Sequence, residues 1–224
     1  MVDKLDTMLT IKPPVLQVAL DFTRIEDALK VSEAVISGGA DWLECGTPLI
    51  KSEGVKAIKT LKTTFPDIPL VADLKTMDTG TLEAELAFSS GADVITVLAA
   101  ADNKTILDAL EVAKNYGGLV MADLINYPTP LNRAKELEIL GVHIILMHLG
   151  IDQQRFRAFP IDDIPLVKKE IKSFLAVAGG LNDLTARQAF LNGADILVVG
   201  GFITRSANPR EATRKIKEAL RSGA

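Results

Sequence analysis

Cysteine and histidine are scarce in this 224-residue chain, which has one cysteine, Cys45, and two histidines, His143 and His148. These counts exclude an intramolecular disulfide, a cysteine-rich zinc site and a histidine-rich metal site. Aromatic residues make up only 5%, which argues against a stacking surface for single-stranded nucleic acid. Because 25 Lys and Arg stand against 29 Asp and Glu, no basic field exists to hold DNA or RNA.

Long apolar runs are also missing, since none approaches the 18 or more residues that a membrane span needs. Residues 1–10 carry three charges and lack the apolar region of a signal peptide. We therefore expect a soluble, cytoplasmic protein that contacts neither membrane nor nucleic acid.

Short apolar runs, by contrast, recur eight times and read as buried parallel strands. They begin near Val15, Asp41, Pro69, Asp93, Gly118, His143, Ser173 and Asp195. The gaps between these starts leave room for one helix each, and the intervening segments have amphipathic helical spacing. Alternating strands and helices imply parallel β-α-β crossovers.

A longer repeat lies over this alternation. Gly-Ala-Asp occurs at residues 39–41, 91–93 and 193–195, and Gly141-Val142-His143 fills the remaining place. The glycines lie 52, 50 and 52 residues apart, so four units of two strands each are expected. This predicts an α/β fold, a single (β/α)8 TIM barrel over residues 15–224, preceded by an extension over residues 1–14. A doubly wound open sheet is the alternative, although it would not require eight evenly spaced strands.

Ionisable residues cluster at the carboxyl ends of the predicted strands, where (β/α)8 barrels place their chemistry. They are Asp21, Glu44, Asp73, Lys75, Asp78, Asp123, His148 and Asp152. Asp73 and Lys75 are two residues apart in one strand, so both side chains are expected to project into the barrel mouth. A purely structural ion pair at the rim is the alternative for this pair.

Glu44 and Asp73 are expected on adjacent strands at corresponding depths. Two carboxylates beside open water positions suit Mg²⁺, with Mn²⁺ also possible. The alternative is a salt bridge between Glu44 and Lys75. His148 is the imidazole at a strand end and is a candidate for proton transfer near neutral pH, with a satisfied structural histidine as the alternative. His143 and Cys45 are interpreted as structural residues.

Two glycine pairs, Gly179-Gly180 and Gly200-Gly201, follow the seventh and eighth strands. In these barrels the corresponding loops often bind phosphate, and glycine lets backbone N–H groups approach an anion closely. The pairs therefore predict a phosphate site, although tight turns alone would also use glycine. Arg205 lies just beyond and either assists or is solvated.

With these residues in place, the chain resembles the 3-hexulose-6-phosphate synthases of the orotidine-5′-phosphate decarboxylase superfamily. The similar stretches are LQVALD (16–21), ECGTPLIKSEG (44–54), ADLKTMDTG (72–80), HLGID (148–152), AVAGGL (176–181) and VVGGFIT (198–204). The orotidine monophosphate decarboxylase branch has lysine where this chain has Glu44. The 3-keto-L-gulonate-6-phosphate decarboxylase branch has arginine at the two positions where this chain has Ile151 and Gly201. The absence of both arginines favours the synthase. Ribulose-phosphate epimerases need two early histidines, which this chain lacks.

The resemblance implies an aldehyde-lyase that condenses formaldehyde with D-ribulose 5-phosphate to D-arabino-3-hexulose 6-phosphate through a 1,2-enediolate. It implies a metal on Glu44 and Asp73, proton transfer by His148, charge stabilisation by Lys75, and hydroxyl binding by Asp21. The two glycine pairs would hold the phosphate. The resemblance further implies a homodimer in which Asp78 reaches into the partner's site. The decarboxylase and a catalytically idle sugar-phosphate-binding barrel are the alternatives.

Overall fold

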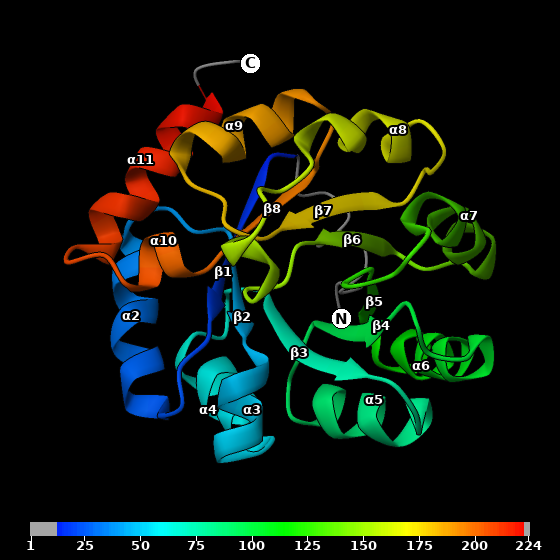
Figure 1. Ribbon diagram of the computed structural model, residues 1–224. Coiled ribbons are helices and arrows are strands. Elements are labelled where there is room, and N and C mark those ends of the chain that lie inside the picture. The colour runs from blue at the N-terminus through cyan, green and yellow to red at the C-terminus, as the bar shows by residue number, and fades with distance from the viewer. Residues whose placement is uncertain (1–12, 222–224) are drawn as a thin grey trace.

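Eight parallel strands close into a barrel in the order β1 to β8, each hydrogen-bonded to its sequence neighbours and β8 to β1 (Figure 1). The computed structural model describes residues 13–221. The strands are β1 Val15–Leu20, β2 Trp42–Cys45, β3 Leu70–Thr76, β4 Val94–Leu98, β5 Leu119–Asp123, β6 Ile144–His148, β7 Phe174–Ala178 and β8 Ile196–Val199. The predicted (β/α)8 barrel is confirmed, and every expected strand start lies within one residue of the observed one.

Helices surround the barrel and connect successive strands (Figure 1). They are α2 Ile25–Ser37, α3 Thr47–Glu53, α4 Lys56–Thr64, α5 Gly80–Ser89, α6 Asn103–Tyr116, α7 Pro130–Leu140, α8 Ile164–Lys168, α9 Asp183–Leu191, α10 Gly201–Thr204 and α11 Pro209–Arg221, with 3-10 turns η1 Gln153–Arg155 and η2 Ile161–Asp163. Within residues 13–221 no helix has the length and apolarity to cross a membrane. Most of the predicted N-terminal extension, residues 1–12, lies outside the described residues.

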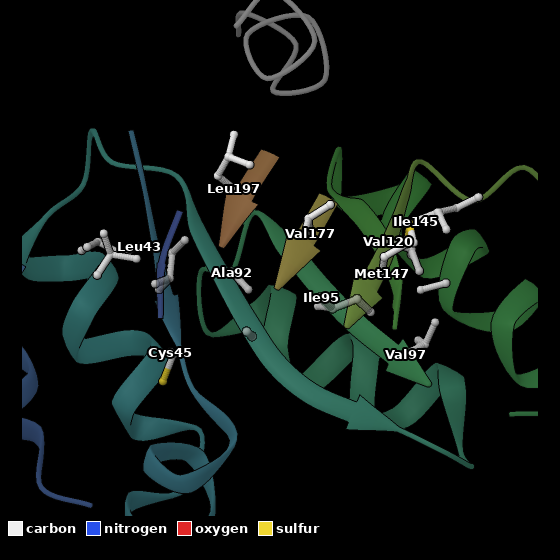
Figure 2. Packing of buried hydrophobic residues seen from close by; sticks show 14 of the residues in the cluster. Leu43, Cys45, Ala92, Ile95, Val97, Val120, Ile145, Met147, Val177 and Leu197 are labelled. Atoms are coloured by element: carbon white, nitrogen blue, oxygen red, sulfur yellow. The ribbon is translucent and has the colours of Figure 1, made fainter. Parts of the chain in front are cut away.

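The strands are mostly apolar because both of their faces are buried. Residues such as Leu43, Ile95 and Val177 point outward and pack under the helices (Figure 2). Their neighbours, including Val94 and Met121, point inward and fill the barrel. Polar side chains inside the barrel are therefore exceptions, and they lie in the middle or at the carboxyl ends of the strands.

The aspartates of the fourfold repeat connect neighbouring strands and helices at the opposite, amino-terminal end of the barrel. Each aspartate accepts a hydrogen bond from a backbone N–H of the preceding strand and pairs with a lysine: Asp41 with Leu16 and Lys217, Asp93 with Leu70 and Lys62, Asp195 with Leu175 and Lys168. The repeat glycines have φ between +85° and +106°, which favours glycine at the helix end. The repeat is thus structural.

His143 takes the place of the aspartate in the remaining unit. Its Nδ1 accepts the backbone N–H of Val120 at 3.1 Å, as the aspartate oxygens do elsewhere. Burial lowers the pKa of His143. An unprotonated Nδ1 is needed for this bond, so the interpretation of His143 as structural agrees with its position.

Because of the hydrogen bond between Val120 and His143, we expect the free energy of unfolding to depend on pH. Because the pKa of His143 is lower in the folded state, its stabilising contribution is present above the unfolded value near 6.5. It is lost as pH falls through the folded-state value. In His143→Asn an amide oxygen can accept the same N–H without titrating. Denaturant unfolding between pH 8 and pH 5 should show the wild type losing stability relative to the variant. A difference that stays constant over this range would contradict the assignment.

Candidate active site

A cavity of about 750 Å³ opens at the carboxyl ends of the strands. Nine of the ten predicted site residues line it: Asp21, Glu44, Asp73, Lys75, His148, Gly179, Gly180, Gly200 and Gly201. Asp78 does not. It is exposed in the turn after β3, where its Oδ1 accepts the N–H of Thr79. Within one chain, the structure therefore separates Asp78 from the other nine.

Lys75 leaves the regular strand geometry that the sequence pattern predicts. Its φ is +51°, and the pairing of β3 with β4 jumps from Ala72↔Ile95 to Thr76↔Val97. Two extra residues are thus accommodated on β3, which is a bulge. The strand β3 continues to Thr76, but the bulge interrupts the regular alternation from which the common direction of Asp73 and Lys75 is predicted. The side chains of Asp73 and Lys75 meet nevertheless, with Nζ 3.0 Å from both carboxylate oxygens.

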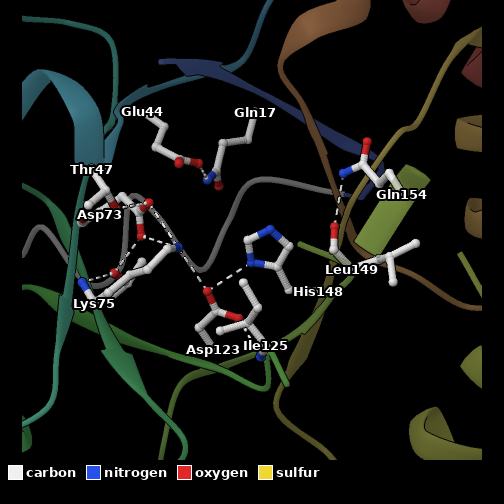
Figure 3. A network of polar contacts seen from close by, with 11 residues as sticks. Gln17, Glu44, Thr47, Asp73, Lys75, Asp123, Ile125, His148, Leu149 and Gln154 are labelled. Carbon is white, nitrogen blue, oxygen red and sulfur yellow. Dashed lines mark hydrogen bonds and ion pairs between the residues drawn. The ribbon is translucent and has the colours of Figure 1, made fainter. Parts of the chain in front are cut away.

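Asp123, from the end of β5, joins Lys75 to His148 (Figure 3). Its Oδ2 accepts Lys75 Nζ at 3.0 Å and lies 2.9 Å from His148 Nδ1. Asp123 is only 1% exposed, so both contacts are shielded from water. Sequence reasoning placed Asp123 at a strand end but gave it no role. Its position in line with the other strand-end carboxylates was the available signal.

Two hydroxyls complete the surroundings of Asp73, and Figure 3 shows that of Thr47. Thr47 Oγ1 donates to Oδ2 at 2.6 Å, and Thr96 Oγ1 donates to Oδ1 at 2.8 Å. Together with Lys75 Nζ, they fix both oxygens of the carboxylate. Sequence reasoning missed both threonines, although Thr96 is the polar residue in the otherwise apolar run of β4.

Glu44 is held by Gln17, another buried residue that sequence reasoning missed. Gln17 Nε2 donates to Glu44 Oε2 at 2.5 Å, and Gln17 is completely buried in β1. Glu44 is aligned with Val71 in the ladder, two residues before Asp73, so the two carboxylates are offset rather than at corresponding depths. No hydrogen bond or ion pair joins Glu44 to Lys75 in the described structure, which disfavours the alternative of a salt bridge.

The charges in the cavity are unevenly compensated. Burial raises the pKa of Glu44 well above its ordinary value, and the negative charges of Asp73 and Asp21 add to the rise. Burial also raises the pKa of Asp21, again reinforced by Asp73. The three carboxylates thus repel one another, and of these it is Asp73 that pairs directly with Lys75.

The pKa values of Lys75 and Asp123, by contrast, shift in the directions that keep both groups charged. Burial alone would lower the pKa of Lys75, but the carboxylates of Asp73, Asp123 and Glu44 outweigh it and raise the value. Burial would raise the pKa of Asp123, yet the hydrogen bonds and charges of His148 and Lys75 lower it. Lys75 is therefore an ammonium and Asp123 a carboxylate near neutral pH.

A divalent cation fits the chemistry of this donor set. Among residues 13–221, no group of three His, Cys, Asp or Glu side chains is arranged to hold a metal alone. Mg²⁺ needs only one or two protein carboxylates, because it retains waters and binds substrate oxygens. The mutual repulsion of Glu44, Asp73 and Asp21 favours a second positive charge beside Lys75.

The glycines make room where the ends of β7 and β8 line the cavity. At Gly179, with φ of +122°, a Cβ would lie 2.5 Å from the carbonyl oxygen of Leu149. At Gly201 a Cβ would lie 2.2 Å from the guanidinium of Arg205, which also lines the cavity. Arg205 therefore folds back over the start of α10 toward the predicted phosphate site.

The sequence profile of the orotidine 5′-phosphate decarboxylase / HUMPS family matches residues 14–216. The chain belongs to this family. The 3-hexulose-6-phosphate synthase of Mycobacterium gastri is 37% identical over 205 residues, which cover 92% of this chain and 99% of the relative. This bears out the resemblance found in the sequence, and membership of the family makes the chain an enzyme.

Solved structures of the family have the same architecture. The 3-hexulose-6-phosphate synthase from Salmonella typhimurium is 37% identical with a TM-score of 0.90, over 96% of this chain and 100% of that one. The 3-keto-L-gulonate-6-phosphate decarboxylase from Vibrio cholerae is 29% identical with a TM-score of 0.82, over 95% and 99%. Both branches share the barrel, and the identity is higher with the synthase.

Cys45 offers a direct test of how tightly the site wall is packed. It follows Glu44, is completely buried, and points outward under the helices (Figure 2). Burial raises its pKa to about 12, helped by the charges of Glu44 and Asp73. We expect the native protein at pH 8 to react with a thiol reagent such as DTNB only as fast as it unfolds. One thiol per chain should appear in guanidinium chloride, and rapid labelling of the native protein would contradict this packing.

Proposed function

We propose that this enzyme condenses formaldehyde with D-ribulose 5-phosphate to form D-arabino-3-hexulose 6-phosphate, reversibly. The observation that carries the proposal is the continuous set of contacts from Asp73 through Lys75 and Asp123 to His148. This arrangement puts a fixed positive charge and an imidazole beside the carboxylates of the same cavity. The relatives named 3-hexulose-6-phosphate synthase, at 37% identity over nearly the whole chain, support this substrate class.

His148 is proposed to move the proton at C1 of the ketose phosphate. The carboxylate of Asp123 only accepts hydrogen bonds, so His148 Nδ1 carries the proton that lies between them. Nε2, on the opposite side of the ring, is then the basic nitrogen. It takes the C1 proton as the enediolate forms. After C1 attacks formaldehyde, the proton returns to the new hydroxymethyl oxygen.

Lys75 is proposed to stabilise the developing negative charge with its ammonium group. Its raised pKa keeps it protonated, which suits a hydrogen-bond donor and not an amine that forms a Schiff base. Asp73 and Asp123 hold the ammonium between them, so little reorganisation is needed when the charge appears. Asp21 is proposed to bind substrate hydroxyls from β1.

Glu44 and Asp73 are proposed to hold Mg²⁺, with Mn²⁺ as the possible substitute. When bound, the metal would polarise the ketone and offset the charge of the enediolate. A hydrogen bond from Gln17 fixes the orientation of the Glu44 carboxylate. Hydrogen bonds from Thr47 and Thr96 fix the orientation of the Asp73 carboxylate. These contacts reduce the freedom that both carboxylates would lose on binding a cation.

Gly179, Gly180, Gly200 and Gly201 are proposed to hold the phosphate through backbone N–H groups. Arg205 adds a positive charge at the same wall of the cavity. The substrate would then be anchored at its phosphate, with C1 directed toward Lys75 and His148.

Asp78 is proposed to act in the site of a second copy, within a homodimer. It is exposed and does not line the cavity of its own chain. Exposed apolar side chains occur on the same turn, on the α5 helix that follows it, and on α6, which packs against α5: Met77, Leu82, Leu86 and Leu107. Such a group on packed neighbouring helices is suited to burial against another chain. A cytoplasmic location also remains a prediction.

The decarboxylase is the second candidate, since it shares the barrel. Ile151, at the position where that branch carries arginine, lines the cavity and is 67% exposed. Gly201, at the other such position, has the guanidinium of Arg205 where its Cβ would be. Neither position supplies a decarboxylase arginine, which favours the synthase. A non-catalytic binding barrel would have no need of the Lys75–Asp123–His148 contacts.

Formaldehyde consumption in the presence of ribulose 5-phosphate and Mg²⁺ tests the proposal. We expect Lys75→Ala and Glu44→Gln each to lower kcat/KM by about 100- to 1000-fold, because charge stabilisation is lost. EDTA should abolish consumption and added Mg²⁺ should restore it. Lys62→Met is the matched control, because Lys62 pairs with Asp93 at the other end of the barrel. Activity that survives Lys75→Ala and Glu44→Gln would contradict the assignment, and release of CO₂ from 3-keto-L-gulonate 6-phosphate would favour the decarboxylase.

Mixing two inactive variants tests the shared site. Lys75→Ala and Asp78→Ala homodimers should each be inactive, because every site lacks one residue. After unfolding and refolding together, mixed dimers would contain one intact site. We expect about a quarter of the wild-type activity to return, since about half of the dimers are mixed. No recovery in demonstrably mixed dimers would show that Asp78 does not act across the interface.

A further inference from the structure

Thr96 has an unusual position for a polar residue. It is 2% exposed in the middle of β4, between Ile95 and Val97, which pack outward under the helices. Its side chain points into the barrel, where it lies on the cavity wall below Lys75. A valine of the same shape would be expected at this position on packing grounds alone.

The hydroxyl of Thr96 connects two parts of the site at once. It accepts the backbone N–H of Lys75 at 2.9 Å and donates to Asp73 Oδ1 at 2.8 Å. The direction of both bonds is fixed, since a backbone N–H only donates and a carboxylate only accepts. The single hydroxyl hydrogen is therefore committed to Asp73, and an oxygen lone pair is committed to Lys75.

The bulge explains why Lys75 needs such a partner. Between Ala72 and Thr76 the strand has two more residues than β4, so the Lys75 N–H has no regular ladder position. Lys75 also has φ of +51°, an unfavourable conformation for a residue with a side chain. The Thr96 hydroxyl substitutes for the missing backbone acceptor and holds this conformation in place.

The conformation matters because it aims the lysine side chain. From the bulge, Nζ reaches Asp73 on its own strand and Asp123 on β5, each at 3.0 Å. A regular strand would not bring the residue to the same place. The geometry thus links one hydroxyl to the position of the ammonium and to the orientation of the Asp73 carboxylate.

We propose that Thr96 is a positioning residue for the reaction, whose hydroxyl holds both Lys75 in its left-handed backbone conformation and Asp73 in its orientation. This inference rests on the proposed function, because it concerns the two residues assigned there to charge stabilisation and metal binding. Thr96 acts through these neighbours and contacts no reacting atom in the proposed mechanism.

Thr96→Val and Thr96→Ser separate the hydroxyl from the methyl group. Valine keeps the shape and loses both hydrogen bonds, whereas serine keeps them and loses the methyl. We expect Thr96→Val to lower kcat about 10- to 100-fold with KM changed less than about threefold, because charge stabilisation and not substrate anchoring is lost. Thr96→Ser should retain kcat within about threefold of the wild type.

Thr213→Val is the control for stability. Thr213 is completely buried in α11, its hydroxyl donates to the carbonyl of Pro209, and neither residue lines the cavity. It should lower the unfolding midpoint as Thr96→Val does, but leave kcat unchanged. If Thr96→Val does not fold, Thr96→Ala provides a second variant without the hydroxyl.

The outcomes separate this inference from the proposed function. Wild-type kcat in folded Thr96→Val, or equal losses in the valine and serine variants, would overturn the positioning role alone. A wild-type protein that consumes no formaldehyde with ribulose 5-phosphate would contradict the proposed function, and this inference would fall with it. A loss of kcat in the valine variant that serine restores supports the role.

Discussion

A half-buried ammonium shared by two buried carboxylates is the interaction on which the site depends. Lys75 Nζ lies between Asp73 and Asp123, which come from β3 and β5 and are 5% and 1% exposed. Neither carboxylate would be stable there without the cation, because an unpaired buried charge costs several kcal/mol. The strand-end positions, the bulge in β3 and the hydroxyl of Thr96 all serve to bring these three groups together.

The two ends of the barrel use similar residues for different purposes. At the amino-terminal end, Asp41, Asp93 and Asp195 each pair with a lysine and also accept a backbone N–H, so their charges tie strands together. At the carboxyl end, Asp73 and Lys75 line an open cavity. The first arrangement satisfies its hydrogen bonds within the scaffold. The second leaves groups facing a space where substrate would bind, which is where chemistry becomes available.

The excess of negative charge at the carboxyl end of the barrel determines the electrostatic properties of the cavity. Burial and mutual repulsion raise the pKa values of Glu44 and Asp21, while the pKa of Asp123 is lowered by its two partners. Neighbouring carboxyl groups in one cavity therefore have separate electrostatic roles. The carboxylates of this site suit a cationic ligand, whereas the Lys75 ammonium suits a substrate that becomes more negative as it reacts.

The sequence by itself determined the barrel, because strand and helix periodicity and the spacing of Gly39, Gly91 and Gly193 are local features that repeat along the chain. It also placed the main strand-end residues in one region, since parallel strands share a carboxyl end. The tertiary structure decided the features that the spacing of residues along the chain does not specify. The bulge at Lys75 and the contacts of Gln17, Thr96 and Asp123 depend on register between strands far apart in sequence, and Asp78 lies away from its own cavity.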